Sequence, residues 1–236
     1  KTGNGAFMKE LKDSVALARE MVAIGTMAGK RMAAVITDMD QPLGSAVGNS
    51  LEVIEAIETL RGEGPSDFKE VVFALGAQML VFAGKAAETA EAKSLMESAI
   101  ADGSALSKFA EFVRAQGGDA AAVYDTSLLP VAKQTLIVES PRDGYVHRIL
   151  AEDVGIACMT LGGGRETKES KIDLSVGIRL RKKNADAVKR GEPLAVIYGN
   201  DAAKMEAARA KIVGAYEISD EPREKEAVIR QYIFPE

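Results

Sequence analysis

RMAAVITDM, residues 31–39, is an apolar run with a polar end at Thr37 and Asp38. Such a run is typical of a buried strand that leads into a functional loop. Apolar residues such as Leu11, Val15 and Val22 recur near helical spacing before it, which predicts a helix from Met8 to about Ala28. Because helix and strand alternate here, the sequence predicts an α/β unit with a parallel sheet.

Further helices are predicted after this strand. One begins at Asn49, whose side chain can cap it while Glu52, three residues on, reaches back in a capping box. Gly62 to Pro65 ends that helix, and Pro65 begins another that runs to about Ala83. A third helical stretch covers residues 89–115 with an interruption at residues 102–103. The first half of the chain is therefore expected to be mainly helical.

The second half shows short apolar segments separated by glycines. GYVHRI, GIACMTLGGG, DLSVGIRL and EPLAVIYG are each interpreted as strands, followed by a helix near residues 201–213 and the closing strands AYEIS and AVIRQYIF. The change of character lies near residues 126–135. We therefore expect an α/β domain over residues 1–130 and a β-rich domain over residues 131–236.

The composition of this 236-residue chain argues against several classes of function. The formal net charge is −5 and the basic residues are scattered, which disfavours a nucleic-acid partner. No apolar run approaches the ~20 residues that cross a bilayer, and the sequence begins without a signal-peptide pattern. The expectation is a cytoplasmic protein without a membrane partner.

Cysteine and histidine are too scarce for zinc sites or catalytic triads. Cys158 is the single cysteine and lies in an apolar run, so a buried, unreactive thiol is favoured over a nucleophile. His147 is the single histidine and lies on an alternating strand, where it is assigned no role.

Several sequence blocks carry a family resemblance. They are KTGNGAFM at the start, TDMDQPLGSAVGNSLEVIEAIETLRGEG, LGGGRETKESKIDLSVG and DAVKRGEPLAVIY. In this order, and over nearly the whole chain, they resemble the pyrimidine-nucleoside phosphorylase and thymidine phosphorylase family. The match is to the C-terminal portion only, which implies that the chain is a fragment. The implied fold is the C-terminal part of a nucleoside phosphorylase or phosphoribosyltransferase-like α/β domain, with a β-rich subdomain of hammerhead or barrel-sandwich type.

The resemblance also implies a reaction. Phosphate attacks the anomeric carbon of a pyrimidine nucleoside and the free base leaves, so nucleoside and phosphate are the expected small-molecule partners. In the family, the residues that hold phosphate and base lie upstream of the position of Lys1. No catalytic residue is therefore assigned here, and the fragment alone is expected to be inactive and either monomeric or non-specifically associated. Its other expected partner is the N-terminal portion of the same protein, within a parent homodimer.

The opening glycines allow two interpretations. A Gly-rich turn between a strand and a helix can hold an anion on backbone N–H groups, but GNG is short of a full fingerprint and a plain turn is the alternative. By resemblance, Phe7 lies where the family places an apolar residue against the pyrimidine ring. The alternative for Phe7 is a core aromatic that anchors the helix start, and both can hold at once.

A monovalent cation, K⁺, is implied next. The resemblance places its ligands in this segment at Leu43, Ala46 and Glu55. Leucine and alanine can bind a cation only through backbone carbonyls, while a glutamate supplies charge. The alternative is a solvated acidic helix face, since Glu52, Glu55 and Glu58 share one side. The family's other cation ligands lie upstream, so only part of this site is expected here.

Two other segments suggest weaker hypotheses. The glycines before Arg165 are interpreted as a bulge or mobile connection between strands, not a phosphate loop. NADAVKRGEPLAVIYG resembles the turn of biotinyl and lipoyl carrier domains but lacks their modified-lysine motif, so a carrier-like or regulatory module is an alternative function. A related phosphoribosyltransferase is another, with Asp38 and Asp40 as weak metal-binding candidates. The preference for uridine or thymidine depends on residues upstream.

Overall fold

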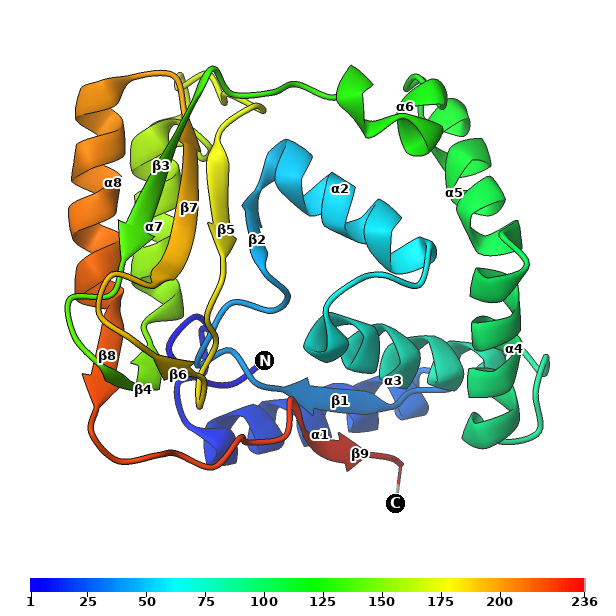
Figure 1. The fold of residues 1–236 in the computed structure, drawn as a ribbon. Helices are drawn as coiled ribbons and strands as arrows, with labels where there is room; N and C mark the ends of the chain where they lie inside the picture. Colours follow the sequence, from blue (N-terminus) through cyan, green and yellow to red (C-terminus); the bar gives the residue numbers. More distant parts are fainter. Residues whose placement is uncertain (236) are drawn as a thin grey trace. The chain divides into compact units, whose positions relative to one another are not determined.

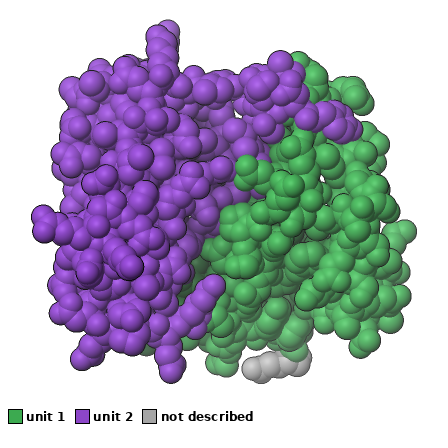
Figure 2. All heavy atoms as spheres, viewed as in Figure 1, with its two compact units in different colours: residues 1–39, 57–123, 227–236 green, residues 40–56, 124–226 purple. Residues whose placement is uncertain are grey.

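The computed structural model describes residues 1–235. It divides the chain into two compact units, coloured in Figure 2. Unit 1 comprises Lys1–Met39, Ile57–Val123 and the residues from Ala227 on, and unit 2 comprises Asp40–Ala56 and Tyr124–Glu226. Each unit is built from segments far apart in sequence, whereas the expected domains were continuous on either side of residue 130. That division of the chain into domains stays a prediction.

Unit 1 contains most of the helices. Its elements are α1 (Leu11–Met27), β1 (Ala34–Thr37), α3 (Ser66–Phe82), α4 (Thr89–Ala101), α5 (Ser104–Ala115), α6 (Ala121–Tyr124, at its border) and β9 (Ile229–Ile233) (Figure 1). The helices expected at residues 8–28, 65–83 and 89–115 are thereby confirmed, including the break at Asp102 and Gly103. α1 packs on β1 and β9 through Ala18, Val22, Ile36 and Ile233.

Unit 2 contains most of the strands. Its elements are β2 (Ala46–Gly48), the start of α2 (Asn49–Leu60), a 3₁₀ turn (Thr126–Leu128), β3 (Gln134–Glu139), β4 (Gly144–Ile149), α7 (Ala151–Leu161), β5 (Gly177–Leu180), β6 (Ala187–Val188), β7 (Pro193–Gly199), α8 (Ala202–Ala215) and β8 (Tyr216–Ser219). One sheet has the order β2-β5-β7-β3 and the other β6-β4-β8. The neighbouring helices α7 and α8 complete a core that includes Val154, Ile197 and Ile212 (Figure 1).

The mixed α/β class is confirmed, but the strand direction differs from the expectation. β1 pairs antiparallel with β9, and the other ladders between named strands are antiparallel too. Within residues 1–235, parallel pairing is limited to isolated bridges from Thr2 to Met8 and to Asp38. The prediction of a parallel sheet is therefore wrong for the described strands, because β1 takes its partner from the distant end of the chain.

One predicted strand is a helix. GIACMTLGGG was interpreted as a strand, but Ala151–Leu161 forms α7 and ends at Gly162, which has φ 103°. The apolar side chains of Val154, Ala157, Cys158 and Leu161 fall at helical spacing and are all buried. The short apolar run was ambiguous by itself, and the acidic first turn upstream was the overlooked signal for a helix start.

Candidate functional site: two loops that hold the predicted residues

The Gly-rich segment at residues 2–8 is bonded to the end of β1. The Thr2 N–H donates to the Thr37 carbonyl at 2.9 Å, and the Thr2 carbonyl accepts from the Met39 N–H at 2.7 Å. The Gly5 N–H donates to the Met39 carbonyl at 2.8 Å. Gly3 has φ 114°, a conformation that L side chains rarely adopt. These bonds make the segment an ordered loop beside the carboxyl end of β1.

Phe7 stands at the tip of this loop with its side chain fully exposed. The interpretation of Phe7 as a core aromatic is therefore wrong in this structure, since no core surrounds the ring. α1 begins only at Leu11, so the ring does not anchor the helix start either. The other interpretation, that the Phe7 ring faces a ligand, stays a prediction.

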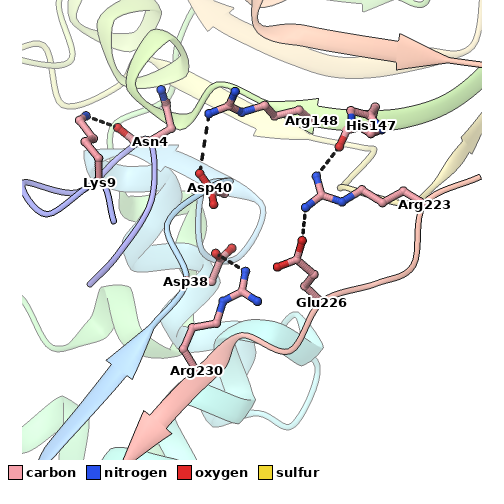
Figure 3. Close-up of polar contacts among 9 residues, drawn as sticks. All are labelled: Asn4, Lys9, Asp38, Asp40, His147, Arg148, Arg223, Glu226 and Arg230. Carbon is pink, nitrogen blue, oxygen red and sulfur yellow. Dashed lines mark hydrogen bonds and ion pairs between the residues drawn. The ribbon is translucent and has the colours of Figure 1, made fainter. Parts of the chain in front are cut away.

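A buried ion pair lies at the same end of β1. Arg230 donates from Nη2 to Oδ1 of Asp38 at 2.7 Å (Figure 3). The Asp38 N–H donates to the Val228 carbonyl. Asp38 is buried and Arg230 is mostly so. In unit 2, Asp40 lies 4.0 Å from Arg148 (Figure 3). Each aspartate of the TDMD segment thus has an arginine partner, which disfavours the metal-binding pair that a phosphoribosyltransferase would need.

The loop at residues 41–46 is held to α2 by Glu55. Oε1 of Glu55 accepts hydrogen bonds from the Ser45 N–H at 2.9 Å and the Ala46 N–H at 3.0 Å. Glu55 is buried, so it is not part of a solvated acidic face, and that alternative is wrong for this residue. Gly44 has φ 68°, and its α-carbon lies close against the Glu55 carboxylate. Two backbone donors compensate part of the cost of burying this charge.

A lysine approaches the same loop from the turn after β5. Nζ of Lys183 donates to the carbonyls of Pro42 and Gly44, the latter at 2.6 Å. The neighbouring Asn184 N–H donates to Oε1 of Gln41 at 3.0 Å. Sequence reasoning missed Lys183, because it lies about 140 residues from the loop and inside the charged run of residues 181–183, which reads as solvent-exposed. No local pattern signals this contact.

The predicted cation ligands are brought together in unit 2, whereas Phe7 belongs to unit 1. Leu43 is half-buried in the loop, Ala46 is the buried first residue of β2, and Glu55 binds the Ala46 N–H. Within residues 1–235, no group of three or more His, Cys, Asp or Glu side chains could hold a metal ion. Carbonyl oxygens together with one carboxylate do suit a monovalent cation that prefers oxygen ligands. Asn184, whose N–H bonds the Gln41 side chain, has a buried Oδ1 with no hydrogen-bond partner among the described residues.

The start of α2 differs in detail from the predicted capping box. Oε1 of Glu52 does reach back, but it accepts from the Gly48 N–H at 3.0 Å. The Asn49 side chain caps nothing here and donates instead to the Gly163 carbonyl at 2.9 Å. The three glycines after α7 therefore end a helix and receive a contact from α2. The prediction of a connection between two strands is wrong, because α7 and not a strand precedes them.

Cys158 is buried, as predicted. Burial raises the pKa of the Cys158 thiol to about 11, with a smaller contribution from the negative charge of Glu52. Its Sγ donates weakly to the Val47 carbonyl at 3.6 Å. A thiol with so high a pKa is a poor nucleophile near neutral pH. His147 is exposed, and its backbone carbonyl accepts a hydrogen bond from Arg223 (Figure 3).

Unit 1 also contains a hollow of about 1320 Å³. It is lined by α3, α4 and β9, with Phe73, Lys93, Tyr232 and Phe234 among the residues on its walls. None of the predicted site residues lines it.

No helix within residues 1–235 is both long and apolar enough to cross a membrane.

Comparison with known proteins connects these loops to a family. Residues 1–106 match "Glycosyl transferase family, a/b domain", and residues 145–219 match "Pyrimidine nucleoside phosphorylase C-terminal domain". Over 200 residues the chain is 56% identical to a pyrimidine-nucleoside phosphorylase of Geobacillus stearothermophilus. The chain belongs to the pyrimidine-nucleoside phosphorylase family. That alignment covers 85% of the chain and 46% of the relative.

Other relatives agree with this assignment. Pyrimidine-nucleoside phosphorylases of Bacillus subtilis and Staphylococcus haemolyticus are 52% and 51% identical over 200 residues, again 85% of this chain and 46% of each relative. The chain thus spans about half the length of the relatives it matches. The family assignment favours the phosphorylase interpretation over the carrier-like module and over the phosphoribosyltransferase.

Proposed function

We propose that this chain forms the C-terminal part of an enzyme that cleaves pyrimidine nucleosides with phosphate. In the reaction, a phosphate oxygen forms a bond to the anomeric carbon of the sugar. The bond from that carbon to the base nitrogen breaks, its electron pair leaves with the base, and the base nitrogen gains the proton that the phosphate loses. The single observation that carries this proposal is the 56% identity over 200 residues to a protein named for this activity.

The activity is tested with the full-length protein that contains this chain. Uridine or thymidine is incubated with inorganic phosphate, and the free base and the sugar 1-phosphate are measured by chromatography. We expect both products in equal amounts, and no reaction without phosphate. Full-length, folded protein that releases no base from either nucleoside would reject the proposal. The comparison of the two nucleosides also gives the base preference.

The chain by itself is proposed to be inactive, because the family's phosphate and base ligands lie upstream of Lys1. Its partner is proposed to be the N-terminal portion of the same protein, and the parent a cytoplasmic homodimer. Activity is measured for this chain alone and after mixing it with the separately purified N-terminal portion, and light scattering gives the mass of the full-length protein. Turnover by the chain alone would reject its proposed inactivity. A monomeric full-length protein would reject the proposed homodimer.

Phe7 is proposed to form an apolar wall against the pyrimidine ring. The support is its complete exposure on a loop that three backbone hydrogen bonds order. F7A in the full-length protein is expected to raise the KM for nucleoside roughly tenfold, since one apolar contact of this size is worth about 1–2 kcal/mol. The KM of F7L, which keeps part of the apolar area, should lie between the KM values of the wild type and F7A. An unchanged KM for both variants would remove Phe7 from the site.

A K⁺ ion is proposed to bind the carbonyls of Leu43 and Ala46 and the carboxylate of Glu55. The support is that Leu43 and Ala46 lie on one short segment and that the buried carboxylate of Glu55, on α2, binds the Ala46 N–H. When bound, the ion would supply positive charge that orders this loop. E55Q tests the proposal, because an amide oxygen keeps the shape but removes the charge. We expect K⁺ to raise the melting temperature of the full-length wild type more than choline does, and E55Q to lose that difference.

The residue ranges 1–130 and 131–236 are proposed as domains, the second of hammerhead or barrel-sandwich type. The support is the family match of residues 145–219. Limited proteolysis tests the boundary, which should give first cleavage near residues 126–135. A first cut within residues 40–56 instead would contradict it.

A further inference from the structure

Two carbonyl oxygens of the loop at residues 41–46 bind a positively charged side chain of the protein itself. Nζ of Lys183 donates to the carbonyls of both Pro42 and Gly44. An ammonium group that bonds several backbone carbonyls occupies the position that a monovalent cation takes among such oxygens. Lys183 is half-buried, so water replaces these bonds less readily than it would at an exposed lysine.

The N–H groups of the same loop face the opposite charge. Oε1 of Glu55 accepts from Ser45 and Ala46, and the carboxylate lies close against Gly44. An irregular loop must find partners for its backbone polar groups. Here the Glu55 carboxylate accepts from N–H groups of the loop and the Lys183 ammonium donates to its carbonyls, so both charged groups contribute to the shape of the loop.

The turn that carries Lys183 is itself held firmly. The Lys183 N–H donates to Oδ2 of Asp186 at 2.7 Å, and the Asp186 N–H donates back to the Lys183 carbonyl. Asn184 bonds Gln41 through its N–H. Ala185 has φ 76°, in the left-handed region that non-glycine residues rarely adopt. Such a conformation persists where the surrounding contacts over-determine it, and it is often found at functional positions.

We propose that Lys183 is a positioning residue that acts as the tethered cation of this loop. Its ammonium group orients the peptide groups of Pro42 and Gly44. It thereby holds the loop in the shape that Leu43, Ala46 and Glu55 need to bind a free cation. The carbonyls that Lys183 bonds are those of Pro42 and Gly44, whereas the carbonyls predicted to bind the free cation are those of Leu43 and Ala46. The first part stands on the geometry of unit 2, and only the effect on a free cation rests on the proposed function.

The test is chemical rescue in the full-length protein. K183A removes the ammonium and leaves room for a small cation. Melting temperatures are measured at constant ionic strength in choline, methylammonium, ammonium, K⁺ and Na⁺ chloride. We expect K183A to lose several degrees in choline and to regain at least half of the loss in methylammonium or ammonium. The wild type should show a smaller response to these ions.

Lys182 provides a matched control. It is the preceding residue, and its Nζ bonds the Ala187 carbonyl and Glu192 instead of the loop. K182A should therefore show no selective rescue by ammonium ions. Loss of stability in K183A that is equal in all salts, or no loss at all, would overturn the proposal.

Hydrogen exchange provides a second readout. In K183M, which keeps the aliphatic stem, the Ser45 and Ala46 amides should exchange about tenfold faster, while K182M leaves them unchanged. Unchanged exchange in K183M would also overturn the proposal. These measurements are independent of turnover, so an inactive wild type would reject the proposed function without deciding the role of Lys183.

Discussion

A Cβ atom added to Gly44 would stand 2.1 Å from Oε2 of Glu55. The loop therefore approaches the carboxylate more closely than any residue with a side chain would allow. Because Gly44 also has φ 68°, two separate physical reasons require glycine at this position.

G44A is expected to destabilise the protein by about 3 kcal/mol, from the left-handed backbone and the collision with Glu55 together. Gly84 is the matched control, since it has φ 66° and nothing within 4 Å of an added Cβ. G84A should cost only about 1 kcal/mol. Urea denaturation measures both, and equal losses would show that contact with Glu55 contributes nothing.

A185G is expected to stabilise the protein by about 0.5–1 kcal/mol. Glycine relieves the strain of φ 76°, and this gain exceeds its greater entropy in the unfolded chain. Ala207 is the control, because it is exposed in the middle of α8. A207G should destabilise by about 1 kcal/mol. If both variants lost stability in a thermal melt, the backbone strain at Ala185 would be refuted.

R230M is expected to cost about 3–5 kcal/mol, because it leaves the buried carboxylate of Asp38 without its arginine. The double variant D38N/R230M should recover part of this loss of stability, since it also removes the buried charge of the Asp38 carboxylate. R209M is the control, because Arg209 pairs with Glu206 on an exposed helix surface. It should cost less than about 1 kcal/mol. Similar losses for R230M and R209M in urea denaturation would contradict a buried pair.

The Cys158 thiol should resist alkylation by iodoacetamide at pH 8 in the native protein and react readily in urea. Mass spectrometry measures the labelled fraction. Its pKa is raised from 9.0 to about 11, so the folded state favours the neutral thiol. The stability that this shift contributes is fully present below pH 9 and is lost as the pH rises toward 11. Rapid labelling of folded protein at pH 8 would contradict the burial, and in C158A the loss of stability over this pH range should be smaller.

Much of the fold follows from local sequence signals. The helices at residues 66–82, 89–101 and 104–115 could be predicted because apolar spacing, Pro65 and the Asp102–Gly103 break are all local features. The strand at Ala34–Thr37 and most strands of unit 2 were predicted for the same reason. One exception, α7, arose because a short apolar run fits a strand or a helix until its packing partners are known.

The pairings of distant segments depend on three-dimensional packing. The contact between Lys183 and the Pro42 carbonyl, the pairing of β1 with β9, and the Arg230–Asp38 bond each join residues more than 140 positions apart. No local pattern encodes such partners, because an exposed lysine and a loop-binding lysine have the same neighbours in sequence. Local propensity and apolar spacing act over a few turns of chain, whereas burial and charge pairing depend on which surfaces meet when the chain folds.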